Sequence, residues 1–375
     1  MEYSGLVTVS RVEKYDPAML RKAIDRQFAL LGVEELLRPG MKVVFKPNLL
    51  AARKPEQAVT THPMVVEAAA DWFLARGITN ITLADSPGGL YTEGLLKGIY
   101  QTCGLRQLED RIKLNTDVTW VAKSREAGKY CKSFNLIRPI AQADLVVNLA
   151  KVKTHGMTTL SAGMKNLFGC VPGLQKPELH YRYPNQQAFA GMLVDLDELV
   201  APAVTVLDGI VATEGDGPSS GTPRQMGCLF AARDLYAQDW AVAQAMGLEP
   251  DTVPMLKEAL ERGLVCPEKI RLEGDPMPQL EPFRLPRGIS LDFVSKLPPV
   301  FRRPARALMD RILRPTPKID LGRCVGCGKC AESCPPHTIE IRQGKAHINL
   351  KNCISCFCCQ EMCPVHVISV RRIVK

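Results

Sequence analysis

The sequence predicts an α/β fold: a mostly parallel, doubly wound sheet domain followed by a small α+β domain. Short apolar runs alternate with helical patterns through residues 1–280, and nine of the 14 cysteines lie between Cys324 and Cys363. At 375 residues the chain is long enough for two domains. We place them at 1–275 and 318–375. Nine prolines make the basic stretch 276–317 a linker.

In the large domain, runs rich in apolar and β-branched residues predict strands, and helical spacing of apolar residues predicts helices. Because helices connect successive strands, we expect the strands to run mostly parallel. Ligands of such sheets bind at the carboxyl ends of the strands. The predicted strands are 6–9, 42–45, 78–84, 144–149, 204–207 and 228–231, and the predicted helices are 18–30, 63–76, 235–246 and 253–263.

Charged and small residues follow the predicted strands at this edge. Small residues let the backbone approach a ligand closely, and charged side chains can bind one. His155 is a catalytic candidate because histidine transfers protons near neutral pH, and Lys165 is the second, in a group of lysines that could hold an anion. The predicted substrate- or cofactor-binding residues are Lys46, Asn48, Asp85, Gly88, Gly89, Lys151, Lys153, Asn166, Asp208 and Glu214.

Several of these residues have a structural alternative. Asp85 and Asp208 could cap the turns that follow their strands, and the lysines could be solvated. The pair Gly88-Gly89 could hold a phosphate through backbone N–H groups, although it matches no established nucleotide motif. Glu214 could bind a divalent metal with Asp216, or could belong to an acidic loop rich in Gly, Pro and Ser.

The cysteines of the small domain form a repeated motif. Residues 324–335 and 353–364 both read C-x-x-C-x-x-C-x-x-x-C-P, with an offset of 29 residues. Three thiolates at this spacing can bind three irons of one 4Fe-4S cube, and proline turns the chain away after the fourth cysteine. Zinc sites usually consist of two C-x-x-C pairs and do not call for the third cysteine and the C-P. The motif therefore predicts two 4Fe-4S clusters.

This motif resembles that of bacterial two-cluster ferredoxins, in which the fourth cysteine of each repeat binds the other cluster. Short strands predicted around Gly344 and at 367–370 fit the same small fold, and the additional thiol of Cys358 is expected to pack beside a cluster. The resemblance implies one cluster held by Cys324, Cys327, Cys330 and Cys363, and a second held by Cys353, Cys356, Cys359 and Cys334.

The large domain resembles the family called domain of unknown function 362, over about residues 5–275. That family often carries a C-terminal ferredoxin module. A more distant similarity to the nickel-pincer lactate racemases implies that His155 transfers a proton and that Lys165 anchors a cofactor or an anionic substrate; the pincer pattern itself is not matched, so a further cofactor stays unknown. The family motifs are Lys46-Pro-Asn48, Thr61-His-Pro63, Asp85-Ser-Pro-Gly-Gly89, Lys153-Thr-His155, Met164-Lys-Asn166, Phe168-Gly169 and Asp208-Gly209 with Glu214-Gly215.

Positive charge is concentrated in the C-terminal quarter. Residues 281–375 contain 17 Lys and Arg against 7 Asp and Glu, a net charge of +10, whereas the whole chain carries +9. This charge favours an acidic redox partner and disfavours nucleic acid, since no nucleic-acid-binding motif accompanies it. An amphipathic segment at 305–313 makes a membrane surface the weaker alternative. Clustered cysteines and the missing signal-peptide pattern predict a cytoplasmic protein.

Three functions stay open at this point. The first is an iron–sulfur oxidoreductase that passes single electrons through both clusters to or from a small-molecule substrate or cofactor in the large domain. The second is a ferredoxin-like electron carrier or accessory protein that docks on a partner redox enzyme. The third is a racemase- or transferase-like enzyme with structural clusters. Substitution of His155 or Lys165 should abolish the first and third activities and leave the second intact.

Overall fold

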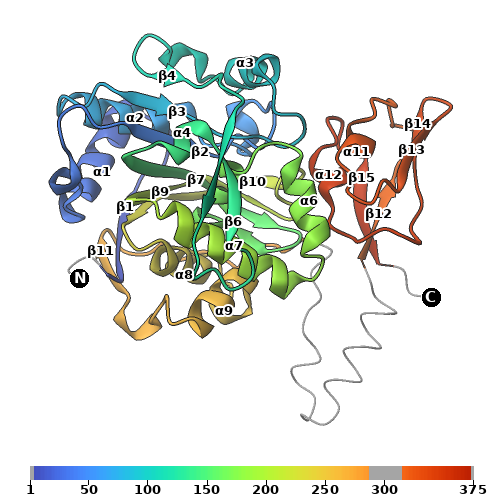
Figure 1. Cartoon of the computed structure of the whole chain (residues 1–375). Coiled ribbons are helices and arrows are strands. Elements are labelled where there is room, and N and C mark those ends of the chain that lie inside the picture. The colour runs from blue at the N-terminus through green and yellow to red at the C-terminus, as the bar shows by residue number, and fades with distance from the viewer. Residues whose placement is uncertain (1–3, 287–314, 373–375) are drawn as a thin grey trace, which may run out of the picture.

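The computed structural model describes residues 4–286 and 315–372. A sheet covered by helices on both faces forms the large domain, and a smaller unit lies beside it (Figure 1). Most of the predicted linker, including the amphipathic segment at 305–313, lies outside the described residues. Within the described part of the chain, no helix is both long and apolar enough to cross a membrane.

The large domain is built on one mixed sheet with parallel central strands. Neighbouring strands are parallel from β9 through β7 and β2 to β3, whereas β10 is antiparallel to both β9 and β1. The predicted α/β, mostly parallel fold is therefore confirmed. The strand order is β11 (Arg271–Gly274), β1 (Leu6–Arg11), β10 (Thr222–Ala232), β9 (Val204–Glu214), β7 (Leu145–His155), β2 (Val43–Pro47), β3 (Ile81–Leu83) and β4 (Lys113–Leu114), and β8 (Thr159–Ser161) pairs with β7.

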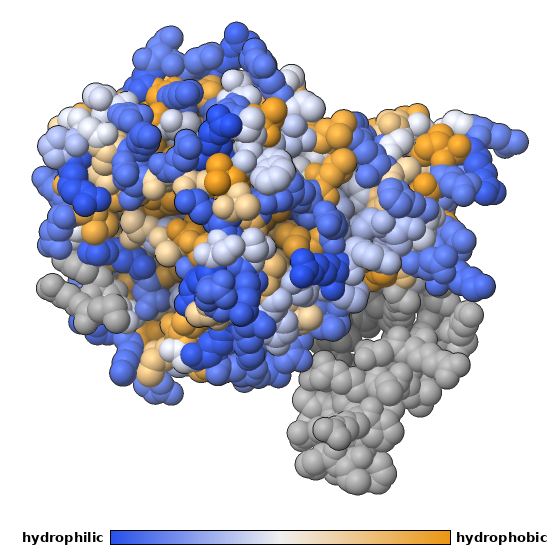
Figure 2. Space-filling view, in the orientation of Figure 1, coloured by the Kyte–Doolittle hydropathy of each residue, from blue (hydrophilic) through white to orange (hydrophobic). Residues whose placement is uncertain are grey.

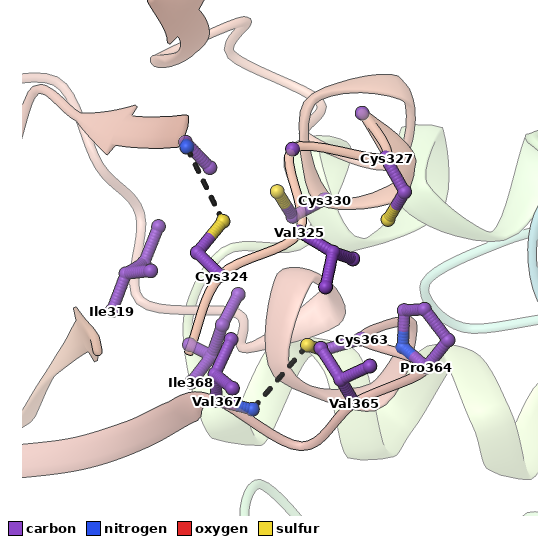
Figure 3. A pocket seen from close by; sticks show the side chains of 13 residues that line it. Ile319, Cys324, Val325, Cys327, Cys330, Cys363, Pro364, Val365, Val367 and Ile368 are labelled. Atoms are coloured by element: carbon purple, nitrogen blue, oxygen red, sulfur yellow. Dashed lines mark hydrogen bonds between the residues drawn. The ribbon is translucent and has the colours of Figure 1, made fainter. Parts of the chain in front are cut away.

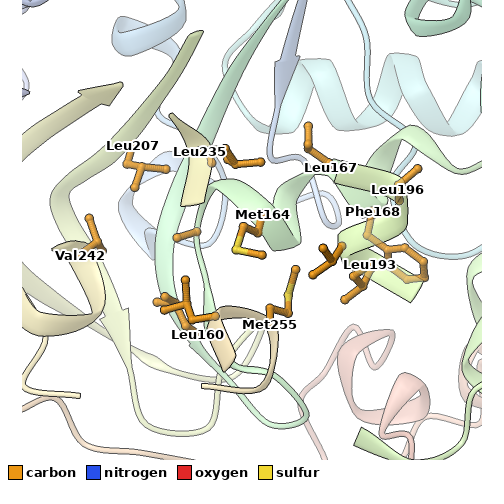
Figure 4. Packing of buried hydrophobic residues seen from close by; sticks show 14 of the residues in the cluster. Leu160, Met164, Leu167, Phe168, Leu193, Leu196, Leu207, Leu235, Val242 and Met255 are labelled. Carbon is orange, nitrogen blue, oxygen red and sulfur yellow. The ribbon is translucent and has the colours of Figure 1, made fainter. Parts of the chain in front are cut away.

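Two sets of helices cover the two faces of the sheet. Alternate residues of a strand enter different cores, so that Val43 and Phe45 of β2 pack with one set and Val44 packs with the other. Figure 4 shows part of the core that contains Val44. The first set is α1 (Pro17–Leu30), α2 (Pro63–Leu74) and α3 (Glu93–Thr102), and the second is α5 (Gly163–Asn166), α7 (Gln186–Val200), α8 (Leu235–Ala245) and α9 (Pro254–Glu261).

The remaining elements of the large domain lie around this sandwich. A separate antiparallel hairpin joins β5 to β6. Short helix α6 follows α5 along the chain and borders the smaller unit in Figure 1. The bounds are β5 (Trp120–Ser124), β6 (Ser133–Ile137), α4 (Arg138–Ala141) and α6 (Gln175–Arg182).

Two central strands are longer than the sequence predicted. β7 runs to His155 and β9 to Glu214, where loops were expected after residues 149 and 207. The polar residues suggested loops, but β8 and the end of β9 pair with this part of β7, and all of its residues are buried. Helix α7 was missed because residues 189–197 are all buried, which leaves no amphipathic stripe.

The smaller unit, residues 315–372, is here called the cysteine module. It contains two antiparallel strand pairs and two short helices, as the small α+β fold predicts. Pro315 and Pro317, which were assigned to the linker, lie in its first strand. Its elements are β12 (Pro315–Ile319) paired with β15 (Ile368–Arg372), β13 (Ile339–Arg342) paired with β14 (Lys345–Ile348), α11 (Lys329–Glu332) and α12 (Cys358–Glu361).

A buried ion pair joins β7 to β9. The ammonium of Lys151 lies 2.9 Å from a carboxylate oxygen of Asp208, and both side chains are at most 1% exposed. The Tyr15 hydroxyl donates to the other Asp208 oxygen at 2.9 Å, and the backbone N–H of His62 also donates to this carboxylate. The pair therefore ties together both strands, the segment after β1 and the start of α2.

Lys151→Met should strongly destabilise the large domain, because it leaves the Asp208 charge buried without a cation. We expect the free energy of unfolding, measured in urea by circular dichroism, to fall by about 3–5 kcal/mol. The control is Lys97→Met, which breaks an exposed pair with Glu93 and should cost less than about 1 kcal/mol. Equal losses in the two variants would contradict a stabilising role for the buried pair.

Candidate functional site

A pocket that opens to solvent, here called the crevice, lies between the large domain and the cysteine module, and the space within it, open solvent included, is about 710 Å³. Its walls come from the ends of β2 and β7, the segment after β3, helices α5 and α6, and helix α12 of the module. It therefore lies at the carboxyl ends of the parallel strands, where the sequence placed a site. The predicted residues that line it are Lys46, Asn48, Asp85, Gly88, Gly89, Lys153, His155, Lys165 and Asn166.

Three predicted binding residues do not line the crevice. Lys151 and Asp208 are paired with each other in the core. Glu214 lies 2.7 Å from Arg224 and 2.7 Å from Arg284, so it attaches the segment after β11 to the end of β9. Lys151 and Asp208 lie inside β7 and β9, whereas the sequence placed them in loops after these strands, and Glu214 is the last residue of β9. The charge of each is already balanced by a partner in the chain.

His155 presents its Nε2 atom to the crevice. Its Nδ1 accepts hydrogen bonds from the backbone N–H groups of Met157, at 3.1 Å, and Thr158, at 3.3 Å, so the proton of the neutral ring is on Nε2. Burial, followed by the charge of Lys165, lowers the pKa of His155 well below its usual value. His155 is therefore a neutral hydrogen-bond donor toward the crevice. A donor at this place can stabilise an oxygen that carries negative charge.

The lysines of the crevice have different surroundings. Lys46 lies 2.7 Å from the Asp85 carboxylate, which is buried beside it. Asp85 also accepts a hydrogen bond from Leu49 N, so it holds the segment after β2 and does not cap its own turn. Gly169 makes this pair possible, because a methyl group at that position would collide with both side chains. The Lys46 charge is thus neutralised within the large domain.

Lys153 has no carboxylate within hydrogen-bonding distance among the described residues. Its ammonium donates to Asn48 Oδ1 at 2.8 Å and to the Val59 carbonyl at 2.9 Å. Asn166 keeps Asn48 in place, since Asn48 donates to its side-chain oxygen at 3.0 Å. Burial lowers the pKa of Lys153 to about 7. Asn48 and Asn166 therefore orient the amine without neutralising it.

Lys165 is the least satisfied of these lysines. Its ammonium lies 4.5 Å from the centre of the Phe168 ring, and no hydrogen-bond acceptor for it is found in residues 4–286 and 315–372. Burial lowers the pKa of Lys165, and the charge of Glu361 opposes that shift. Lys165 can therefore offer three N–H donors to a ligand.

Several residues of the crevice carried no signal in the sequence. Lys176 donates to Ser86 Oγ at 3.0 Å, and burial lowers its pKa to about 7. His180 stacks on Phe189, and burial lowers its pKa to about 3. Both belong to α6, where no motif marked them. Ser333, Cys358, Glu361 and Met362 also line the crevice, but they come from the module, far away in the sequence.

The cysteine module contacts the large domain directly, as the space-filling view shows (Figure 2). Met362 packs against Gly88 and Gly89, and a side chain at Gly88 would collide with its sulfur. The two glycines thus leave room for the end of helix α12. The sequence had suggested instead that they could hold a phosphate. Ser220 Oγ lies 2.9 Å from Nδ1 of His366. Arg53 donates to the carbonyl of Cys363 at 3.4 Å.

The cysteine sulfurs surround two cavities of about 310 and 290 Å³ in the module. No three His, Cys, Asp or Glu side chains of the described residues converge closely enough to hold a single metal ion. The donor sets suit larger thiolate-bound clusters and match the exchanged grouping that the ferredoxin resemblance implied. The first cavity is lined by Cys324, Cys327, Cys330 and Cys363 (Figure 3), and the second by Cys334, Cys353, Cys356 and Cys359.

Backbone groups are directed at some of these sulfurs. The N–H of Ala346 donates to Cys324 Sγ and that of Val367 to Cys363 Sγ, both at 3.4 Å (Figure 3). Such hydrogen bonds stabilise thiolates and tune the reduction potential of a bound cluster. Cys358 directly precedes Cys359 in the chain and lines the crevice. It is therefore next to a predicted ligand, as expected, and also next to the candidate site.

Comparison with known families gives two matches. The model of the family "Domain of unknown function (DUF362)" matches residues 43–244. This chain belongs to the DUF362 family. In the same DUF362 protein, the model of the "4Fe-4S dicluster domain" matches residues 316–364. The cysteine module is therefore a ferredoxin-type, iron–sulfur-binding domain.

A similar curated protein is the Thylakoid-associated protein sll1697 of Synechocystis sp. It is 33% identical over 266 residues, which cover 69% of the DUF362 protein and 79% of the relative. Among solved structures, the lactate racemase apoprotein from Thermoanaerobacterium thermosaccharolyticum has a TM-score of 0.40 at 13% identity, and a protein from Thermotoga maritima has 0.40 at 10%. Each match covers 64% of this chain but only 58% and 61% of the two solved chains.

The buried Lys153 should give the stability a distinctive pH dependence. The pKa of Lys153 is about 7 in the folded chain, against its usual value of 10.5, which applies to the unfolded chain. Between about pH 7 and pH 10.5 the unfolded chain therefore binds a proton that the folded chain does not. The contribution of Lys153 to the free energy of unfolding therefore rises with pH across that window, by at most about 1.4 kcal/mol per pH unit. Urea unfolding between about pH 7.5 and 9.5 measures the slope.

Lys153→Met should make this slope shallower, by up to about 1.4 kcal/mol per pH unit, while Lys176, whose pKa is also about 7, keeps its own contribution. The exposed Lys22→Met, on α1, is the matched control and should keep the pH dependence of the unsubstituted protein. If Lys153→Met shows the same rise with pH as the control, then Lys153 does not lose its proton in the folded chain near neutral pH.

Proposed function

We propose that this DUF362 protein is an iron–sulfur oxidoreductase, in which two 4Fe-4S clusters exchange single electrons with a substrate or cofactor bound in the crevice. The supporting observation is that helix α12 forms one wall of the crevice. Cys358 lines that wall, two residues after Cys356 and directly before Cys359, both predicted cluster ligands. A cluster held by Cys356 and Cys359 would thus adjoin the substrate, which favours electron transfer between them.

The large domain would then supply binding and electrostatic stabilisation. The clusters provide single electrons. An electron that reaches a substrate adds negative charge to it, and preorganised donors and cations lower the energy of that charge. The Nε2–H of His155 and the ammonium of Lys165 face the crevice for this role. Asn48 and Asn166 would keep Lys153 oriented toward the same ligand.

Electrons would reach the module from a partner protein. Cys327, a predicted ligand of the other cluster, is exposed, and Val325 beside it is 61% exposed. Arg323 and Lys329 are exposed in the same loop. A partner with an acidic docking surface would suit this combination of apolar and basic residues. The same surface favours the second candidate function, a carrier that only passes electrons between proteins.

The racemase-like alternative receives less support from the geometry. A base that removes a substrate proton needs a free acceptor atom toward the crevice, and the acceptor nitrogen of His155 is engaged by backbone N–H groups. For localisation we retain the cytoplasm as our proposal. The thylakoid association in the name of the relative makes peripheral contact with a membrane surface the alternative.

The two clusters can be tested by iron analysis. The anaerobically purified protein should contain about eight irons, four per cluster. Because Cys327 and Cys363 are assigned to one cluster, Cys327→Ala with Cys363→Ala should leave about four irons. Cys356→Ala with Cys363→Ala should instead damage both clusters. Cys358→Ala is the control and should retain all the iron. Zinc in place of iron, or four irons in the second double variant, would contradict the assignment.

The oxidoreductase can be separated from the carrier by reoxidation kinetics. The clusters are reduced with dithionite, excess reductant is removed, and the low-molecular-mass fraction of a cell extract is added without oxygen. Absorbance of the clusters then follows their reoxidation. Lys165→Gln should slow this reaction by about 100-fold, because it removes a cation that stabilises charge on the substrate.

Lys351→Gln is the control for that measurement, because Lys351 is exposed on the module and remote from the crevice residues. It should react like the unsubstituted protein. Equal rates for Lys165→Gln and the unsubstituted protein would mean that electrons leave without using the crevice, as in a carrier.

A further inference from the structure

A carboxylate of the cysteine module lies inside the crevice. Glu361, at the end of α12, places Oε1 3.4 Å from Nε2 of His155, and its side chain is 17% exposed. Burial raises the pKa of this carboxyl group, and the ammonium groups of Lys165 and Lys153 oppose that shift by attracting its charge. A residue of one domain thus acts as the counter-ion for a group of donors in the other.

Within residues 4–286, no carboxylate lies within ion-pair distance of Lys153 or Lys165. Lys46 is paired with Asp85 and Lys151 with Asp208. Lys153 donates only to neutral oxygens, and Lys165 lies over an aromatic ring. Of the carboxylates that act on Lys153 or Lys165, Glu361 has the largest effect on each. Without Glu361, the two ammonium groups and the His155 N–H would face a buried space together.

The rest of the crevice suits a small organic anion. Its space of about 710 Å³, open solvent included, extends beyond the Glu361 carboxylate, and Phe168, Pro177 and Met362 give it apolar walls. Ser86 and Lys176 add polar groups to these walls, and a few polar groups among apolar ones are the features that hold and orient a small ligand. A carboxylate has the two acceptor oxygens needed for a ring N–H and an ammonium at once.

We propose that the crevice binds a small-molecule carboxylate, and that Glu361 occupies the position of the ligand's carboxylate as a built-in competitor. This inference rests on the proposed function, because it names the substrate class for the same crevice. The ligand must displace Glu361 from its place beside His155 and would then also face Lys165, which lines the same crevice. Since Glu361 shares helix α12 with Cys358 and Cys359, the same displacement reaches the wall that carries the predicted cluster ligands.

The test is equilibrium binding to the full-length protein with its clusters oxidised and oxygen excluded. Acetate, inorganic phosphate and the neutral acetamide are titrated by calorimetry. Glu361→Gln should bind acetate at least tenfold more tightly than the unsubstituted protein, because the competing charge is gone. Acetamide should bind equally weakly to both, and phosphate should gain less than acetate. Adding Lys165→Gln to Glu361→Gln should remove the gain.

Glu332→Gln is the matched control. Glu332 occupies the same place in the first cysteine repeat, 29 residues earlier, but its partner is the exposed Lys329 at 3.0 Å. It should bind acetate like the unsubstituted protein. Cluster absorbance shows that each variant is intact, and Glu361→Ala serves as a second variant with the same expected gain.

Equal acetate affinity with and without Glu361 would overturn the proposal. Weaker binding in both Glu361 variants would also overturn it, since Glu361 would then hold the ligand instead of competing with it. A larger gain for phosphate than for acetate would replace the carboxylate with a phosphate as the ligand class. Binding needs no electron transfer, so the two proposals can fail separately. If Glu361→Gln binds acetate more tightly but Lys165→Gln does not slow reoxidation, only the oxidoreductase function is refuted. If Lys165→Gln slows reoxidation but Glu361→Gln binds acetate no more tightly, only this inference is refuted.

Discussion

Burial of ammonium groups is the constraint on which the candidate site depends. A charged lysine inside a protein is costly unless it is paired or hydrogen-bonded. Lys46 and Lys151 meet this condition with Asp85 and Asp208, and these pairs hold together the segments at the ends of β2, β7 and β9. Lys153 and Lys165 meet it only in part. The paired lysines thus join neighbouring strands, while Lys153 and Lys165 have no carboxylate partner within ion-pair distance among the described residues.

The cysteine module completes the crevice as well as carrying the iron–sulfur site. Helix α12 fits against Gly88 and Gly89 because neither glycine has a side chain in its path. This close approach brings Glu361 to His155 and Cys358 to the wall of the crevice. The predicted cluster ligand Cys359 and the crevice residue Glu361 thus share one short helix, which would connect the two halves of the proposed function.

Sequence patterns predicted the alternation of strands and helices well, because strand and helix periods are local properties of the chain. They failed where burial removed the pattern. The second half of β7 looked like a loop because of Lys151, Lys153 and His155, and α7 is buried along residues 189–197, which include Asp195 and Asp197. The position of the site was predictable for a related reason, since parallel strands bring their carboxyl ends to one edge. Nine of the predicted residues meet there, although their roles are still to be tested.

The sequence by itself determined the iron–sulfur character of the C-terminal domain and the family of the large one, because ligand spacing and short motifs are written in consecutive residues. Only the tertiary structure decided which charges remain unpaired. Lys151 and Lys153 are two residues apart and look alike in the sequence, yet one meets Asp208 and the other the crevice. Glu361 reaches His155 across some 200 residues of chain, a contact that depends on the docking of two domains and leaves no local pattern.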